Sequence, residues 1–439
     1  MIPRTARDAF SETSTLELYL RIEVALAHAQ AELGMIPSEA AAAIERHATS
    51  AALDVARLRA DTATTGYPVA PLVRQLTAMC GEHGRWVHWG ATTQDVLNTA
   101  LAMQVNESWS AIEAQVTLIA TRLVVLAEEH RATLMVARTF GGHALPTTFG
   151  FKVAVWLSAV LRHARRLQLL QNSPMEGELA GAAGTLASFA GKGLSVRRRL
   201  MQLLQLPEQT ITWAAMRDTL NERVMVLANL CATLAKITQD IAELAATEIG
   251  ELSEPASGGR DSSSTLPFKA NPVYCAQATT AATLVATYAN LVLQGARQHQ
   301  ERSAEGMLDF QGAPLAFVHA DDCVRRTLHV LQGVQVFPDR MRANLNLTRG
   351  IVVAEGYMMA LAPHIGRLAA HDRLHDACRA TAESGSELHD ALATMSDVTR
   401  HLDGATLEAL ADPTAYLGDA QTMIDAVLAA ARSHLPEVQ

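Results

Sequence analysis

Apolar residues recur every three or four positions through most of the chain, which is the period of an α-helix. The first clear example spans residues 16–33, where Gly34 ends the pattern and Pro37 and Ser38 start another. Much longer helical patterns cover residues 94–130, 147–171, 214–250, 272–300 and 315–331. Several helices of this length in the middle of one chain predict a helix bundle.

The pattern changes toward both ends of the chain. Before the long helices the predicted helices are short, and an irregular segment, residues 61–72, interrupts them. After about residue 354 the helices are again short and are broken by segments such as APHIG, SGS and HLDG. We therefore predict an all-α fold with a long central helix bundle, residues 101–350, between two small helical domains, residues 1–100 and 351–439.

Several of the long helices are apolar on more than one face, as the segments VTLIATRLVVLA and TLVATYANLVLQ show. A single bundle would leave these faces in water, so we expect oligomerisation to cover them. The charge-free stretch 271–296 is the one segment that suggests a membrane span. Because it carries many Gln, Thr and Asn side chains, a helix buried among other protein helices is the better interpretation, and no membrane partner is expected.

The composition is that of a globular, helical chain. Of its 439 residues, 49% are hydrophobic, 18% are charged and 5% are aromatic, which excludes a disordered or fibrous chain and favours helix over strand. The formal net charge of -9 offers no basic surface for phosphate backbones, so nucleic acid is not an expected partner. Five scattered Cys and an N-terminus without an apolar signal run indicate a cytoplasmic location.

Unusual polar residues gather at the predicted starts of three long helices. In the first cluster, HWGATTQD, Thr92 and Thr93 are suited to cap the helix that follows. In the second cluster, residues 138–148, a Gly-rich turn delivers His143 just before Pro146, a residue suited to the first position of a helix. A helix start offers unpaired N–H groups and the positive end of the helix dipole, so each start is a potential anion site.

The third cluster, residues 262–272, reads SSSTLPFKANP, with Asn271 as a natural cap and Pro272 fitting the first turn. Three such helix starts suit a substrate with several carboxylates. Capping alone is the commoner role of these residue types, but it requires neither His143 nor Lys269. A lone cation beside a helix N-terminus is unfavourable unless an anion joins it, so Lys269 indicates a bound anion, whereas His143 taken alone could equally be a structural histidine.

These clusters resemble the fumarase/aspartase superfamily, whose signature loop reads GSSxMPxKxNP. The likeness covers nearly the whole chain, through VALAHAQAELGMIP, VHWGATTQDVLNTA, HALPTTFGFKVA, GELAGAAGTLASFAGKG, RMRANLNLTRG and DPTAYLGDA. Within the superfamily the chain is most similar to the bacterial 3-carboxy-cis,cis-muconate cycloisomerases, and adenylosuccinate lyase is a more distant relative.

The resemblance implies a homotetramer with a shared multi-helix core, in which clusters from three subunits form each active site without a metal or an organic cofactor. It implies that Ser263 is the catalytic base and that His143 is a second acid/base or a carboxylate binder. The residues expected to bind substrate are His88, Thr92, Thr93, Gln94, Arg138, Thr139, Ser264, Lys269, Asn271 and Arg302. For His88, a hydrogen bond that shapes its turn is the alternative.

The chain departs from the family pattern at several positions, among them Ser262 in place of the loop's Gly, and three of them bear most directly on the substrate. Superfamily lyases carry His where this chain has Phe140, and the cycloisomerases resemble it in carrying an aromatic residue there. Where the signature is written PHKRNP, Phe268 and Ala270 stand in place of its His and Arg, which removes up to two positive donors near the substrate. The first departure favours the cycloisomerase branch, and the second favours a substrate with fewer charges or an apolar arm.

The reaction expected from the resemblance is reversible β-addition and elimination on a polycarboxylate through an enolate-like intermediate, most like the lactonisation of 3-carboxy-cis,cis-muconate. One alternative is a β-elimination lyase that cleaves a C–N or C–O bond of a succinyl-type substrate and releases fumarate or a related alkene. Another alternative is a catalytically inactive helical scaffold. The chain retains Ser263, Lys269 and Asn271, and this set of reactive residue types favours an active enzyme instead. His371 and His375 share one helix face, but Asp replaces the Glu of a zinc-protease motif, so no metal is expected.

Overall fold

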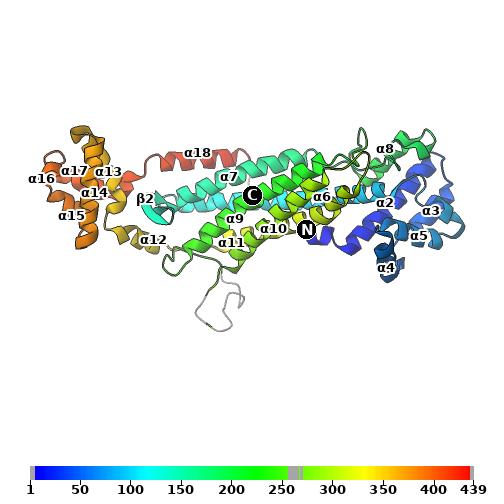
Figure 1. Ribbon diagram of the computed structural model, residues 1–439, viewed down its shortest axis with the longest axis horizontal. Coiled ribbons are helices and arrows are strands. Elements are labelled where there is room, and N and C mark those ends of the chain that lie inside the picture. Colours follow the sequence, from blue (N-terminus) through cyan, green and yellow to red (C-terminus); the bar gives the residue numbers. More distant parts are fainter. Residues whose placement is uncertain (1–4, 256–265, 267–269, 436–439) are drawn as a thin grey trace. The chain divides into compact units, whose positions relative to one another are not determined.

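The computed structural model describes residues 5–255, 266 and 270–435, and these residues form a mostly helical fold (Figure 1). Among them the α-helices are α1 (Ala6–Ala9), α2 (Glu12–Glu32), α3 (Ser38–His47), α4 (Val55–Thr65), α5 (Val69–Met79), α6 (Thr93–Glu129), α7 (Phe149–Gln171), α8 (Gly193–Leu204), α9 (Asp218–Leu244), α10 (Val273–Gly295), α11 (Met307–Gly333), α12 (Pro338–Leu345), α13 (Ala354–Ile365), α14 (Arg367–Ser384), α15 (Leu388–Ala393), α16 (Ser396–Thr399), α17 (Gly404–Ala411) and α18 (Ala420–Arg432). Short strands β1 (Leu134–Thr139) and β2 (Gly142–Thr148) form one antiparallel pair, and β3 (Leu252–Ser253) and β4 (Gln335–Val336) form another. The predicted helical class is therefore correct, with two small strand pairs added to it.

The chain divides into two compact units. Unit 1 comprises Met1–Gln115, His163–Ala235 and Ala278–Arg325, and unit 2 comprises Val116–Arg162, Lys236–Gln277 and Arg326–Gln439. The division falls inside α6, α7, α9, α10 and α11, so each unit holds part of every long helix. The three predicted domains, 1–100, 101–350 and 351–439, stay a prediction.

In unit 1, the short helices α2, α3, α4, α5 and α8 pack around one apolar core (Figure 1). Ser11 begins α2 by accepting the N–H of Ser14, and residues of high helix propensity, mostly Ala, Leu and Glu, fill the helix. The core includes Leu26, Leu72 and Phe189, all nearly inaccessible to solvent. The predicted run of short N-terminal helices is thus present.

Buried polar side chains link the parts of the long helices that lie in unit 1. The indole N–H of Trp109 on α6 donates to the carbonyl of Leu167 on α7 at 3.0 Å. The amide of Gln115 on α6 donates to Asp321 on α11 at 2.9 Å, and Asp321 also accepts the N–H of Ala6. Each of these groups is buried with a partner, which is the condition for a polar side chain to be tolerated in a helical core.

In unit 2, β1 and β2 form a hairpin whose two-residue turn is Phe140–Gly141. Both turn residues have positive φ, 51° and 81°, which is the conformation of the turns that match the twist of a tight hairpin. Phe140 is fully exposed at the tip. A bulky residue seldom adopts positive φ, so the aromatic side chain is presented at a cost in backbone energy.

The hairpin corrects the prediction for Pro146. It lies in β2 opposite Val136, and α7 begins only at Phe149, so Pro146 is not at the first position of a helix. In a two-stranded ribbon a proline without an N–H can stand where no ladder bond is needed. The backbone N–H groups of Phe149 and Gly150 donate to the carbonyls of Thr133 and His130, and these bonds join the start of α7 to the end of α6.

The C-terminal helices α13 to α17 pack together in unit 2 (Figure 1), and their apolar core also includes residues of β1 and α12. This core includes Leu361, Leu374 and Leu388, and the hydroxyl of Tyr357 donates to the carbonyl of Leu407 at 2.9 Å. The predicted short helices after residue 354 are therefore present.

The long helices agree with their predicted spans except at some ends. α6 lies one residue earlier than predicted at each end, whereas α9 stops at Leu244, before Gly250 with its φ of 62°. α10 ends at Gly295 instead of residue 300, and α11 begins at Met307, eight residues early, because the helix accepts Pro314 in its interior. The apolar period locates a helix, but it does not locate the residue at which the helix ends.

Two described helices, Thr93–Glu129 and Asp218–Leu244, are long and apolar enough to cross a membrane by length and composition alone. About half of each apolar window is buried inside the chain, 50% and 44%. Core helices of water-soluble proteins pass the same test, so this is weak support for a membrane span.

Gly150 offers a test of how the start of α7 packs. A Cβ atom at this position would lie 2.5 Å from Cα of Arg131 and 2.7 Å from the carbonyl oxygen of Ala127, both backbone atoms that cannot rotate away. Gly150→Ala should therefore lower the free energy of unfolding by about 1–3 kcal/mol, as overpacking usually does. Urea denaturation at one fixed protein concentration measures this.

Gly404→Ala is the matched control, because a Cβ atom at this first residue of α17 meets no atom within 4 Å. This variant should leave the stability unchanged or slightly raised. Equal stability losses in the two variants would contradict the close packing described for Gly150.

Candidate active site

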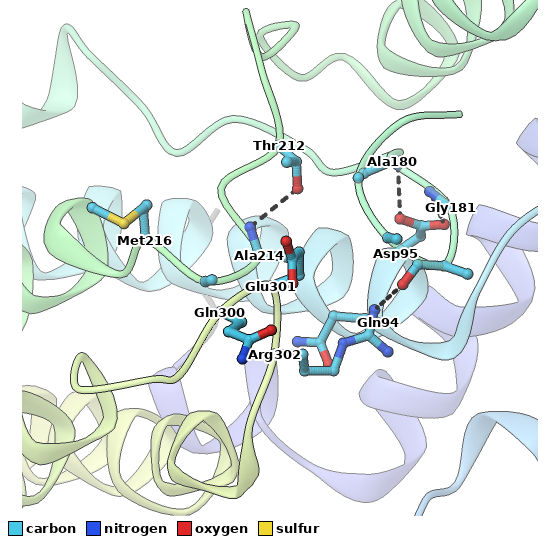
Figure 2. A pocket seen from close by; sticks show the side chains of 14 residues that line it. Gln94, Asp95, Ala180, Gly181, Thr212, Ala214, Met216, Gln300, Glu301 and Arg302 are labelled. Carbon is cyan, nitrogen blue, oxygen red and sulfur yellow. Dashed lines mark hydrogen bonds between the residues drawn. The ribbon is translucent and has the colours of Figure 1, made fainter. Parts of the chain in front are cut away.

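A cavity of about 240 Å³ lies beside the start of α6 in unit 1 (Figure 2). Its wall is formed by Gln94, Asp95, Ala180, Gly181, Ala182, Ala183, Gly184, Thr212, Ala214, Ala215, Met216, Gln300, Glu301 and Arg302. Two of the predicted substrate-binding residues, Gln94 and Arg302, are therefore brought together from distant parts of the sequence. Arg302 donates to the carbonyl of Ala182 at 3.2 Å, which places a guanidinium at the cavity, where it can bind a carboxylate.

The carboxylate of Asp95 holds two walls of this cavity together. It accepts the N–H of Thr92 at 2.9 Å, just before α6, and the N–H groups of Ala180 and Gly181 at 2.8 and 3.2 Å. Asp95 is almost fully buried, and this burial raises its pKa even though the three N–H bonds act in the opposite direction. Thr92 thus precedes the first residue of α6, as predicted, and the carboxylate that accepts its N–H belongs to Asp95, three residues further along the chain.

Glu178 fixes a third part of the wall. Its side chain, 1% exposed, accepts the hydroxyl of Thr212 at 2.8 Å and the backbone N–H of Trp213 at 3.2 Å. Its backbone N–H and C=O both bond the Thr99 hydroxyl on α6. Burial raises the pKa of Glu178 to about 7, and the nearby charge of Asp95 adds to the rise.

His88 is held by Glu23 of α2. Its Nδ1 lies 2.6 Å from a Glu23 oxygen, and Glu23 is itself 1% exposed. Burial of the ring lowers the pKa of His88, but the charge and hydrogen bond of Glu23 and the charge of Asp95 outweigh it, so the pKa is raised. The residue adopts a φ of 57°. These contacts match the alternative expected for His88, a hydrogen bond that shapes the turn before α6.

A second group of predicted site residues lies on the β1–β2 hairpin in unit 2. The guanidinium of Arg138 forms a bidentate pair with the fully buried Glu251, at 3.0 and 2.6 Å. Glu251 also accepts from the amide of Asn344 at 2.8 Å. Thr139 is exposed beside the turn. Glu251 thus neutralises the charge of Arg138, and the pair fixes the hairpin. The outer edge of the guanidinium is left to contact a substrate.

His143 lies opposite Arg138 in the hairpin and is partly buried. Its Nδ1 atom is inaccessible to solvent and has no hydrogen-bond partner among the described residues. Burial lowers the pKa of His143, and the positive charge of Arg138 lowers it further, with partial opposition from Glu251. The imidazole is therefore neutral near pH 7, the form that can take up a proton.

Lys152 of α7 is a charged residue near this hairpin that the motifs do not single out. Burial lowers its pKa, and the charges of Lys236 and Arg138 lower it further, while those of Asp240 and Glu251 oppose the change. A lone Lys inside the apolar stretch FGFKVAVW is the signal that could have drawn attention to it.

The start of α10 differs from the prediction that Asn271 caps it. The N–H groups of Tyr274 and Cys275 donate to the two carboxylate oxygens of Glu254, each at 2.9 Å. Val273 is the first helical residue, and its N–H donates to the Asn271 carbonyl. A negative charge at a helix N-terminus is favourable, so the protein's own Glu254 occupies the donors that the sequence assigns to a substrate anion.

The predicted residues Ser263, Ser264 and Lys269 lie outside the described residues. Of the others, His88, Thr92, Thr93, Gln94 and Arg302 belong to unit 1, and Arg138, Thr139, His143 and Asn271 belong to unit 2. The catalytic and binding roles of all these residues stay predictions.

Sequence reasoning missed the buried carboxylates Asp95, Glu178 and Glu254. For Asp95 a signal exists, because a Thr followed three residues later by an acid is the pattern of a capping box. For Glu178 and Glu254 no local pattern distinguishes them, since their partners lie about 20 to 35 residues further along the chain.

Within the part of the chain that the structure describes, no group of three or more His, Cys, Asp or Glu side chains is placed to hold a metal ion. His371 and His375 are exposed on α14 and lie near their neighbours Asp372 and Asp376.

The described side chains of the two units, each taken by itself, define a class of functional groups. In unit 1 a guanidinium and an amide line one cavity, and in unit 2 the hairpin carries an imidazole whose Nδ1 has no hydrogen-bond partner among the described residues. Such groups can bind carboxylates and move a proton, the two functions that an elimination next to a carboxylate needs.

Comparison with known proteins agrees with this class. A family model described as "Lyase" matches residues 4–286, and one described as "Adenylosuccinate lyase C-terminus" matches residues 350–427. The chain belongs to this lyase family, and the predicted membership of the fumarase/aspartase superfamily is confirmed. It is accordingly an enzyme of the lyase and cycloisomerase group.

The individual relatives match along almost the whole chain. A trans-aconitate decarboxylase of Mycosarcoma maydis is 37% identical over 96% of this chain and 86% of its own length. A 3-carboxy-cis,cis-muconate cycloisomerase of Bradyrhizobium diazoefficiens is 37% identical over 96% of this chain and 95% of its own. The solved 3-carboxy-cis,cis-muconate lactonizing enzyme of Pseudomonas putida superposes with a TM-score of 0.91 at 33% identity, over 98% of this chain and 97% of its own.

Glu178 should make stability depend on pH in a predictable direction. Its pKa of about 7 in the folded chain lies above the ordinary value of 4.5, so the folded state binds more protons than the unfolded state between these values. Stability should therefore fall as the pH rises from about 4.5 to about 7. In Glu178→Gln this fall should be smaller by on the order of 1–3 kcal/mol, as measured by urea denaturation at several pH values.

Glu39→Gln, at an exposed position on α3, is the control and should leave the slope with pH unchanged. Identical slopes in the native protein and Glu178→Gln would mean that Glu178 does not titrate in this window.

Proposed function

We propose that the chain catalyses reversible β-addition and elimination on a polycarboxylate, and that its reaction is most like the lactonisation of 3-carboxy-cis,cis-muconate. The observation that carries this proposal is the end-to-end similarity to proteins named for that cycloisomerisation, in sequence and in fold. The cavity with Arg302 and Gln94, together with the neutral His143, supports the same chemistry.

In the proposed mechanism a base removes the proton α to a substrate carboxylate, and the electron pair moves onto that carboxylate to give an enolate-like dianion. The β-substituent then leaves with its bonding pair, and the alkene forms. Lactonisation is the reverse: a carboxylate oxygen forms the new C–O bond at the alkene, and the α-carbon takes up a proton. Only donors fixed in advance can stabilise the dianion sufficiently.

We assign the proton transfer to Ser263, whose alkoxide needs stabilisation by N–H groups and Lys269. His143 is the second acid/base or a carboxylate binder, since its lowered pKa favours the neutral imidazole and its Nδ1 has no hydrogen-bond partner in the part of the chain that the structure describes. Arg302 binds a carboxylate at the cavity. Thr92, Thr93, Gln94 and Asn271 supply further polar contacts to substrate oxygens.

We further propose that the active protein is a cytoplasmic homotetramer, in which clusters from three subunits complete each active site. Large apolar side chains on the long helices are substantially exposed in the single chain, among them Leu118, Val155, Leu169 and Leu293. Faces of this kind favour burial against another subunit.

Light scattering should therefore give a mass of about four times the 47.1 kDa of the chain. A stable monomer at micromolar concentration would remove the basis for a shared active site.

The second candidate is a β-elimination lyase acting on a C–N or C–O bond of a succinyl-type compound. The observation that favours it is the replacement of His and Arg by Phe268 and Ala270 in the signature loop, together with the adenylosuccinate lyase match at the C-terminus. With fewer positive donors, the site would leave one charge of a tricarboxylate unpaired.

An assay of 3-carboxymuconate beside N-substituted aspartates separates the two candidates. Loss of the muconate absorbance indicates cycloisomerisation, and release of fumarate indicates the lyase. Ser263→Ala should lower the turnover of the true substrate about a hundredfold while leaving the fold intact, because it removes a positioned proton-transfer group.

Ser264→Ala is the matched control and should cost less. Full activity of Ser263→Ala would overturn its assigned role, and a folded tetramer inactive on all these compounds would favour the scaffold interpretation.

A further inference from the structure

Unit 1 contains a further cavity, of about 340 Å³, that shares no lining residue with the candidate active site. Its wall is supplied mainly by α2, the turn between α4 and α5, α6 and α11. These elements lie far apart in the sequence, and no motif draws attention to the space between them. Its volume is in the range of small-molecule sites, about 300–1,000 Å³.

The wall of this cavity is aromatic and uncharged. It includes the rings of Phe10, Tyr19, Tyr67 and Phe310 and the thioether of Met307, in a chain of which only 5% is aromatic. None of the described residues that line it carries a charge. A charged ligand would lose its hydration here without gaining a counter-charge, whereas an aromatic ring would pack against the rings of the wall.

The hydroxyl of Tyr19 is a polar group that the chain leaves unused. Tyr19 lies on α2 and is 7% exposed. Burial alone raises the pKa of its hydroxyl, and no hydrogen bond from the described residues contributes. Buried polar groups are normally hydrogen-bonded. Since a phenolic hydroxyl can both donate and accept, this one is available to a polar group of a ligand.

Gln104 of α6 adds an acceptor to the same wall. Its Nε2 donates to the carbonyl oxygen of Ala9 at 3.0 Å and to Oγ1 of Thr15 at 2.8 Å. A carbonyl oxygen can only accept, so the Gln104 atom that faces Ala9 must be the nitrogen. Because these two bonds use both N–H groups, the amide oxygen is the atom of Gln104 that remains for a ligand.

The mouth of the cavity lies at Tyr67 and Met307. These two lining side chains are 37% and 39% exposed. The hydroxyl of Tyr67 donates to Sδ of Met307 at 3.6 Å. A thioether is a weak acceptor, so this contact between the α4–α5 turn and α11 is readily broken when a ligand enters.

We propose that this cavity is a second ligand site, which binds an uncharged single-ring aromatic compound that carries a hydroxyl group. The ring packs among the aromatic side chains, and the hydroxyl bonds Tyr19 and Gln104. A dry cavity of about 150 Å³ already holds benzene, so about 340 Å³ accommodates a ring with a substituent. The site is separate from the candidate active site and does not depend on the proposed function.

Three compounds of similar shape test the ligand class: p-cresol, p-xylene and p-toluate. They carry a hydroxyl, a methyl and a carboxylate group at the same ring position. Isothermal titration of the whole protein should show that p-cresol binds, and that p-toluate binds about tenfold more weakly or not at all because its charge finds no partner. Failure of the native protein to bind p-cresol, or equal affinity for p-toluate, would overturn the proposal.

Tyr19→Phe tests the hydroxyl, because it removes one oxygen and keeps the ring. The affinity for p-cresol should fall about fivefold with the loss of one hydrogen bond, while the affinity for p-xylene should not change. An unchanged affinity for p-cresol, or an equal change for both compounds, would contradict the role of Tyr19.

Tyr357→Phe is the matched control. Tyr357 is a buried tyrosine of unit 2 whose hydroxyl already has a partner, the carbonyl of Leu407. This variant removes the same atom elsewhere, so the affinity for p-cresol should stay at the native value. The same loss in both Tyr variants would overturn the proposal by showing a general effect on the protein.

A second pair of variants locates the ligand, because Tyr19 also lines a neighbouring cavity of about 410 Å³. Met307 lines only the proposed site and Ala63 only its neighbour, and both are exposed. Met307→Trp fills the mouth and should weaken p-cresol binding about tenfold or more, whereas Ala63→Trp should leave it unchanged. The reverse result would overturn the assignment to this cavity. Thermal unfolding checks that each variant is folded, and Tyr19→Phe decides the matter if Met307→Trp is not.

Discussion

The described cavity depends on the contact between the buried carboxylate of Asp95 and the backbone N–H groups around it. Helix starts and tight loops leave N–H groups without internal partners, and burying them unpaired is costly. Asp95 satisfies one such group before α6 and two in the loop at Ala180 and Gly181. One side chain thereby fixes the distance between the walls, so that Gln94 and Arg302 can line the same space.

Carboxylates of the chain also accept the hydrogen bonds of donor groups at the hairpin and at the start of α10. Glu254 accepts two N–H groups at the start of α10, and Glu251 holds Arg138 on the hairpin. The chain therefore uses its own acids at places where the sequence pattern suggests substrate anions. What such a site offers to a substrate is the set of donors left after these internal bonds are made, and that set is smaller than the number of polar residues in the motifs.

The parts of the fold set by local pattern could be predicted from the sequence, and the parts set by distant contacts could not. The period of apolar residues located α6 to within one residue, and Thr92 correctly indicated its start. Pro146 was misplaced because its position in β2 depends on pairing with β1, a contact that a helix-start motif does not reveal. Likewise, Asn271 had the right residue type for a cap, but Glu254, 20 residues earlier than Tyr274, accepts the bonds.

The same distinction between local pattern and distant contacts applies to the candidate site. Motifs identified Gln94, Arg302 and His143 as residue types suited to the chemistry, because residue type and order along the chain are visible in a sequence. Whether an amide presents its oxygen or its nitrogen depends on the partner behind it, and for Gln94 that partner is reached through Asn98 and Arg217, 119 residues apart. Family membership places the reaction in the lyase and cycloisomerase group. The orientation of a polar side chain at the cavity depends in addition on contacts behind the wall, and these contacts are visible only in the folded chain.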